Sequence, residues 1–290
     1  MSALRWDWSP GVTPSGSGDG PVLVAAFEGW NDAGDAATAA IEHLDLAWSG
    51  EVFAEIDPEE FHDFTVTRPK VRLDGDERVI DWPAHTFVWA QPAMHPGVVL
   101  LRAVEPQLRW RTYCEHVLEV ARALNCRLVV TLGSLLADVP HTRPSPVFGT
   151  AYDDEVIGRL RMQPSRYEGP TGIVGVLHAA CRDAGIDSAS LWAAVPAYVP
   201  STPAPRAALS LLERVAPLIG AAAEAPALVE AARGYEREID ELIEDDDSTV
   251  DYVRRLEEQF DAERAVEESN DRMMSSDGLI DELERFLREQ

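Results

Sequence analysis

An uninterrupted apolar stretch near the N-terminus limits what this chain can fold into. Residues 21–27 read Pro-Val-Leu-Val-Ala-Ala-Phe, without one polar side chain. A short run of this kind fits a strand that is buried on both faces, as in parallel sheets covered by helices. The Ala-rich residues 32–46 follow directly and have helical composition, with Asn31 and Asp32 as suitable N-caps. The beginning of the chain therefore predicts a buried strand followed by a helix.

Strand-like and helix-like segments alternate through most of the chain, which is typical of an α/β fold. Further helices are expected over residues 105–125 and 172–184, and a Pro-rich loop over residues 138–151. Asp74-Gly75 predicts a tight hairpin turn, so the sheet should be mixed rather than purely parallel. Further strands are expected at residues 51–56, 64–67, 70–73, 78–81, 86–90, 98–101, 127–132 and 191–197. The predicted domain is a mixed sheet flanked by helices.

Composition divides the chain into three regions. Residues 1–20 are rich in Gly and Pro and are expected to form a flexible leader, which is followed by the α/β domain at residues 21–223. Residues 224–290 form an acidic helical C-terminal segment whose net charge is −15, out of −26 for the whole chain. Its apolar residues recur at helical spacing, so it needs a surface to pack against. That surface belongs either to its own domain or to a neighbouring protein.

Two helices with apolar stripes are predicted at the start of this acidic segment, and a third is expected after Asp277. Ser248 with Asp251 resembles a capping box that begins the second helix. The stripe of the first helix consists of Leu228, Ala232, Tyr235, Ile239 and Leu242, and that of the second of Val253, Leu256 and Phe260.

The net charge and the cysteines argue against several classes of protein. A charge of −26 repels both the phosphate backbone of nucleic acids and anionic membrane surfaces. Cys114, Cys126 and Cys181 have no metal-ligand spacing and are expected to be buried free thiols. The sequence shows neither a signal-peptide pattern nor an apolar run long enough to span a membrane. These features predict a cytoplasmic protein that binds neither nucleic acid nor membrane.

The loop at residues 29–34 is the first candidate ligand site. Trp30, Asn31 and Asp32 lie between a buried strand and the next helix, and ligands of α/β proteins favour the carboxyl ends of strands. Free amide groups at a helix N-terminus could also bind a small anion there. The alternative is purely structural: a tight turn, an Asn or Asp cap, and a large buried Trp.

The loop at residues 140–144 is the second candidate. His141 could exchange protons near neutral pH, and Arg143 could hold a carboxylate or phosphate. Alternatively, the prolines fix the path of a rigid loop, and Arg143 pairs with a carboxylate elsewhere in the structure. Tyr167 belongs to a further loop, Tyr167–Gly172, which could approach a ligand through its backbone or simply lead into a helix.

Familiar catalytic patterns are absent from the sequence. No G-x-S-x-G elbow supplies a nucleophile, and no H-E-x-x-H pair places two histidines on one face of a helix. We therefore predict no catalytic residue, no metal and no cofactor.

The order of several motifs resembles a known family. Residues 27–37 read Phe-Glu-Gly-Trp-Asn-Asp-Ala-Gly-Asp-Ala-Ala, and Leu132-Gly133, Pro140–Pro144, Tyr167–Gly172 and Val195–Tyr198 follow in similar order. Together they resemble the proteasome assembly chaperone family, second chaperone type, in its bacterial branch with a C-terminal helical extension. The resemblance implies a fold like that of nucleoside phosphorylases and a protein–protein role. Relatives that dock into the proteasome ring end in a hydrophobic residue, Tyr and any residue, whereas residues 288–290 are Arg-Glu-Gln, so no docking tail is expected.

Two functions remain open from the sequence. The first is a protein-binding assembly factor with proteasome-related partners that forms a homo-oligomer, expected to be a trimer. The alternative is a small-ligand-binding protein or enzyme of the nucleoside phosphorylase-like fold. In that case Arg143 would hold an anion, Asn31 or Asp32 would orient the ligand, and His141 would shuttle a proton.

Overall fold

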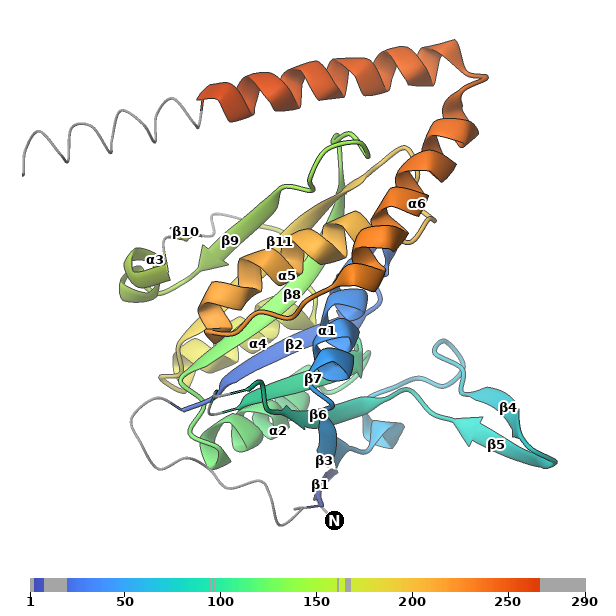
Figure 1. Ribbon diagram of the computed structural model, residues 1–290. Coiled ribbons are helices and arrows are strands. Elements are labelled where there is room, and N and C mark those ends of the chain that lie inside the picture. Colours follow the sequence, from blue (N-terminus) through green and yellow to red (C-terminus); the bar gives the residue numbers. More distant parts are fainter. Residues whose placement is uncertain are drawn as a thin grey trace, which may run out of the picture.

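A mixed sheet of nine strands runs through the part of the chain that the structure describes, and helices cover both of its faces (Figure 1). The computed structural model describes residues 3–7, 20–93, 95, 97–160, 162–164 and 168–266. In spatial order the strands are β1 (Leu4–Trp6), β3 (Glu51–Ile56), β6 (His85–Ala90), β7 (Val98–Val104), β2 (Val22–Glu28), β8 (Leu128–Ala137), β11 (Ser188–Pro196), β9 (Val147–Ala151) and β10 (Gln163–Pro164). This arrangement confirms the predicted mixed sheet flanked by helices.

The centre of the sheet consists of the parallel strands β7, β2, β8 and β11. β2 lies between β7 and β8, with Val24 opposite both Leu100 and Val130. Residues 22–27 are all buried, as the continuous apolar run predicts. The outer strands β1, β3 and β6 pair antiparallel on one side, and β9 pairs antiparallel with β11 on the other.

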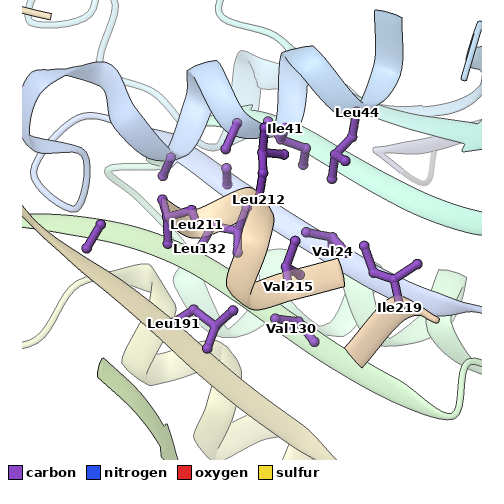
Figure 2. Packing of buried hydrophobic residues seen from close by; sticks show 14 of the residues in the cluster. Val24, Ile41, Leu44, Val130, Leu132, Leu191, Leu211, Leu212, Val215 and Ile219 are labelled. Atoms are coloured by element: carbon purple, nitrogen blue, oxygen red, sulfur yellow. The ribbon is translucent and has the colours of Figure 1, made fainter. Parts of the chain in front are cut away.

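Successive residues of β2 point to opposite faces of the sheet and so belong to two different cores. Val22, Val24 and Ala26 pack beneath α1 (Ala36–Ala47) and α5 (Pro205–Ile219). Figure 2 shows this core, where Ile41 and Leu44 of α1 meet Leu212 and Val215 of α5 above the sheet. The alternate residues of β2, from Leu23 to Phe27, pack on the other face with α2 (Trp110–Ala123) and α4 (Ile173–Asp183). Shorter helical segments are η1 (Ala33–Asp35), η2 (Pro58–Glu60) and α3 (Asp154–Leu160).

Three local predictions are wrong. Residues 64–67, expected to be a strand, form turns, in which the Asp63 carboxylate accepts a hydrogen bond from the Thr65 amide at 2.8 Å. The loop expected over residues 138–151 ends in strand β9, because pairing with β11 organises residues 147–151. The helix expected from residue 105 begins only at Trp110, after an irregular segment that ends with Arg109 at a positive φ of 53°.

The Asp74-Gly75 turn forms the predicted hairpin from β4 (Lys70–Asp74) and β5 (Glu77–Asp81). The hairpin is a separate two-stranded sheet that projects from the body of the protein (Figure 1). Near the N-terminus, Leu4–Trp6 of the expected leader forms β1, and Trp6 packs its ring against Phe53. The remainder of that leader, residues 1–2 and 8–19, lies outside the described residues.

The acidic segment packs on its own domain as far as it is described. α6 (Pro226–Ile243) lies against α5, and a further helix spans residues 247–266. Tyr235, Ile239 and Ile243 of α6 form a buried cluster with Val199 and Val253. The third predicted helix, after Asp277, lies outside the described residues.

Two details of the predicted C-terminal helices are wrong. Leu242 is 67% exposed, because Ile243 takes the inward position at the end of the stripe. Asp246, and not Ser248, caps the following helix, since its carboxylate accepts hydrogen bonds from the backbone amides of Ser248 at 3.0 Å and Thr249 at 3.4 Å. Within the described residues, none of the helices is long and apolar enough to cross a membrane.

Candidate functional site

A cleft of about 720 Å³ opens beside the carboxyl ends of β2 and β8. The loop after β2 supplies residues 29–31, the end of β8 supplies residues 134–136, and the first turn of α4 supplies Gly172, Val174 and Gly175. β9 and β11 complete the wall with Phe148, Thr150, Ser190 and Trp192. The first candidate loop therefore lies where the carboxyl-end rule for α/β sheets places a ligand.

Asn31 is a buried polar residue at this cleft, with only 1% of its surface exposed. Its side-chain nitrogen Nδ2 donates a hydrogen bond to Glu105 Oε1 at 2.8 Å. The same carboxylate oxygen accepts the Ile173 amide at 2.9 Å, so Glu105 caps α4. This donation fixes the orientation of the Asn31 amide and directs Oδ1 away from Glu105.

The side-chain oxygen of Asn31 finds no hydrogen-bond donor among the described residues. A buried polar atom without a partner is rare in folded proteins and costs free energy. Gly172 packs closely on this oxygen, since a Cβ there would lie 2.5 Å from Oδ1. Among the described residues, the lining of the cleft thus contains one acceptor without a donor.

Trp30 and Asp32, the neighbours of Asn31, have different roles. The Trp30 side chain is 69% exposed at the edge of the cleft, so the alternative of a large buried Trp is wrong. Asp32 is buried, and its carboxylate accepts hydrogen bonds from the amides of Ala37 at 2.7 Å and Thr38 at 3.2 Å, in the first turn of α1. Burial raises the pKa of Asp32 above its ordinary value, although these hydrogen bonds oppose the shift. Asp32 acts as the cap that the structural alternative describes.

A chain of hydrogen bonds runs through the cleft wall, to which His178 and Ser190 belong. His178 contacts Ser188 Oγ through Nδ1 and Thr131 Oγ1 through Nε2, both at 2.9 Å, and Thr131 donates to Ser190 Oγ at 2.8 Å. Burial lowers the pKa of His178 to about 4, so the ring is neutral near pH 7. None of the described residues that line the cleft carries a charged side chain. An uncharged interior favours an uncharged occupant.

His141 and Arg143, from the second candidate loop, contact the acidic helices and do not line the cleft. The Tyr198 hydroxyl accepts the His141 backbone amide and lies 2.8 Å from Nδ1, while Nε2 lies 3.0 Å from Asp240 Oδ1 of α6. Because the hydroxyl can donate to Nδ1, the Nε2 proton is available for Asp240.

The guanidinium of Arg143 pairs with the helix at residues 247–266. Its Nε and one terminal nitrogen donate to the two carboxylate oxygens of Asp261, at 3.0 and 2.9 Å, and the other terminal nitrogen contacts Glu257 at 3.1 Å. A bidentate pair of this kind has a defined geometry. The structure thus shows the alternative in which Arg143 pairs with a carboxylate elsewhere. Tyr167, the last predicted site residue, lies outside the described residues.

A second hollow of about 570 Å³ adjoins a buried pair of histidines. His62 Nε2 and His85 Nε2 are 2.7 Å apart, and His85 Nδ1 lies 3.0 Å from the Tyr113 hydroxyl. Burial, and then the neighbouring His62, lower the pKa of His85 to about 3, so this ring is neutral near pH 7. The sequence analysis did not select either histidine, because they are 23 residues apart and belong to no motif.

Sequence reasoning also missed the walls of the main cleft. Ser188 and Ser190 interrupt an otherwise apolar strand, and this polar pair was the available signal for the hydrogen-bond chain. Gly133 was a second signal: a Cβ there would lie 2.8 Å from the ring of Trp192, so the glycine makes room for that ring.

Comparison with known proteins shows which family this chain resembles. The model of the PAC2 family matches residues 26–243. A PAC2 family protein from Streptomyces avermitilis is 46% identical, with a TM-score of 0.75 and coverage of 80% of this chain and 99% of that chain. A proteasome-assembly chaperone homologue from Mycobacterium tuberculosis is also 46% identical, with a TM-score of 0.73 and the same coverage.

More distant structures share the fold. An archaeal proteasome activator from Pyrococcus furiosus is 15% identical, with a TM-score of 0.66 and coverage of 82% of this chain and 97% of that chain. No curated protein matches the chain. The family match spans most of the chain and agrees with two structures at 46% identity, which confirms the resemblance seen in the motifs. The protein belongs to the PAC2 family.

Proposed function

We propose that this protein is a cytoplasmic assembly factor that binds proteasome-related proteins. The observation that carries the proposal is its 46% identity, over 80% of its length, to the proteasome-assembly chaperone homologue from Mycobacterium tuberculosis. The main cleft supports a binding role, since it presents an unpaired acceptor and exposed aromatic side chains. The alternative of an anion-binding enzyme has weaker support, because Arg143 is paired with Asp261 and Glu257 outside the cleft.

We further propose that the protein forms a homo-oligomer, a trimer, in which another subunit covers the projecting hairpin. Val71 lies directly opposite Ile80 in the hairpin, and Leu73 lies two residues along on the same face. All three side chains are exposed. A two-stranded sheet alone is marginally stable in water, so an uncovered apolar face of this kind favours contact with a second copy.

The partner is tested by cross-linked pull-down on purified proteasome subunits, with the full chain compared with a truncation that ends at Ala223. Circular dichroism first establishes that both proteins are folded. The proposal predicts that the full chain captures a defined proteasome subunit, and that the truncation loses this capture if the acidic helices form the interface. If the folded full chain captures none of the subunits, the assembly role is refuted.

The oligomer is tested separately by light scattering during size-exclusion chromatography. The full chain should have three times the mass of a monomer, and Leu73→Asp in the hairpin should reduce that mass. Glu77→Asp, a conservative change at an exposed position of the same hairpin, is the matched control. A monomeric full chain would contradict the proposed oligomer.

A further inference from the structure

The apolar surface around the main cleft extends beyond its interior. Trp30, Leu135, Leu136, Phe148 and Tyr152 all line the cleft, and each is at least 40% exposed. Contiguous exposed apolar side chains mark interaction sites on soluble proteins. A small molecule enclosed by the cleft would leave this outer apolar surface in water, whereas a peptide chain that crosses the cleft would cover it.

The unpaired oxygen of Asn31 selects for a donor. It belongs to a residue that lines the cleft, it has no donor among the described residues, and the donation to Glu105 holds its amide in place. Every residue of a peptide other than proline carries a backbone N–H group, so a peptide can supply this donor whatever its side chains are.

The charges around the cleft favour one sign at the ends of such a peptide. No described residue that lines the cleft is charged. Among the described residues, every charged residue within two sequence positions of a lining residue is acidic: Glu28, Asp32, Asp35, Asp138, Asp153, Asp154 and Glu168. A peptide with an apolar centre and basic ends would match an uncharged cleft with acidic surroundings.

We propose that this cleft binds an extended apolar peptide segment flanked by basic residues, with one backbone N–H of the segment donating to Asn31 Oδ1. The proposal rests on the proposed protein-binding function, because it takes the segment to belong to a protein partner. It deepens that function by naming the surface and the chemistry of what it recognises.

The test is fluorescence polarisation of the full chain with labelled hexapeptides. The first peptide has four apolar residues, Leu and Phe, between two lysines, and the second has aspartates in place of the lysines. The lysine peptide should bind at least tenfold more tightly at low salt, and the difference should shrink at high salt because ions screen the charges. Equal binding of the two peptides, or no binding of the lysine peptide, would overturn the proposal.

Two further measurements locate the contact. Trp30→Ala should weaken binding of the lysine peptide at least tenfold, whereas Trp82→Ala should not, since Trp82 is an exposed tryptophan that lines the second hollow instead. Both side chains are exposed, so neither change should unfold the protein. Methylation of the peptide backbone nitrogens, one at a time, should weaken binding strongly at a single position. If Trp30→Ala and Trp82→Ala have equal effects, the peptide binds elsewhere. If methylation of no single backbone nitrogen weakens binding, the proposed hydrogen bond to Asn31 is wrong.

A competition experiment with a small molecule tests whether the cleft binds such a molecule instead of a peptide. Adenosine, an uncharged aromatic molecule with N–H donors, should not displace the lysine peptide. If it binds in the cleft and the peptide does not, the occupant is a small molecule and the peptide proposal is wrong. Loss of peptide binding with retained capture of proteasome subunits would refute only the cleft, whereas peptide binding without capture would refute only the assembly role.

Discussion

Replacement of Ile239 by Ala tests how the acidic segment is attached to the domain. Ile239 is 1% exposed and lies in the cluster that joins α6 to Val199 and Val253. The change removes three carbon atoms, at about 0.8 kcal/mol for each buried CH₂ group, and leaves a cavity. Replacements of this kind cost about 2–5 kcal/mol in well-packed cores. We expect about 2–4 kcal/mol here, because α6 lies at the edge of the domain and can relax towards the cavity.

The expected effect is local, because this cluster is separate from the two main cores. Amide hydrogen exchange at residues 226–243 and 247–266 should accelerate by roughly 30- to 1000-fold, since each 1.4 kcal/mol is about a factor of ten. Exchange in β2, β8 and β11 should stay unchanged. Leu242→Ala is the matched control on the same helix, and because Leu242 is largely exposed, its stability should change by less than about 0.5 kcal/mol. Equal exchange rates in the two variants would refute the claim that Ile239 attaches the acidic segment to the domain. Faster amide exchange in the central strands would refute the claim that the effect is local.

Three further predictions concern the pH dependence of stability, the close packing of Gly172 against Asn31, and the ion pair between Arg143 and Asp261. Burial lowers the folded-state pKa of His178 to about 4 and that of His85 to about 3, from the ordinary 6.5, so stability should be full above pH 6.5 and fall as the pH drops towards 4. Each ring should contribute roughly 1 kcal/mol per pH unit to this slope in urea midpoints, and His178→Gln should remove about half of it. Gly172→Ala should lower the free energy of unfolding by about 1–3 kcal/mol, seen as a lower thermal midpoint, because the new Cβ would clash with Asn31 and Glu105. Gly158→Ala, in a helix with open space around it, should instead raise stability slightly. Arg143→Gln should cost at most about 1 kcal/mol and speed exchange in residues 247–266 at low salt, whereas Arg233→Gln, whose ion pair lies within α6, should not.

The sequence predicted the parts of the fold that local pattern determines. The continuous apolar run became the central strand β2, and Asp74-Gly75 became a hairpin turn. Strand β9 was missed because its five residues follow a Pro-rich loop, and its pairing with β11 is a contact between distant segments. The capping of α4 by Glu105 could not be predicted for the same reason, since its partner Ile173 is 68 residues away.

The candidate site was predictable only in part. The carboxyl-end rule drew attention to the loop after β2, where Asn31 lies at the cleft. The sequence could not show that His141 and Arg143 face the acidic helices, because their partners lie about 100 residues further along the chain. It also gave no sign that Phe148 and Trp192 would meet at the same cleft, because only the order of the strands brings them together.

The most direct test of the central claim is a time course of proteasome assembly from purified subunits, followed on native gels with and without the full chain. The account predicts that the protein accelerates the formation of assembly intermediates and is found within them, whereas the protein alone, without subunits, gives none of their bands. An unchanged time course, with the protein excluded from every intermediate, would contradict the claim that it is an assembly factor.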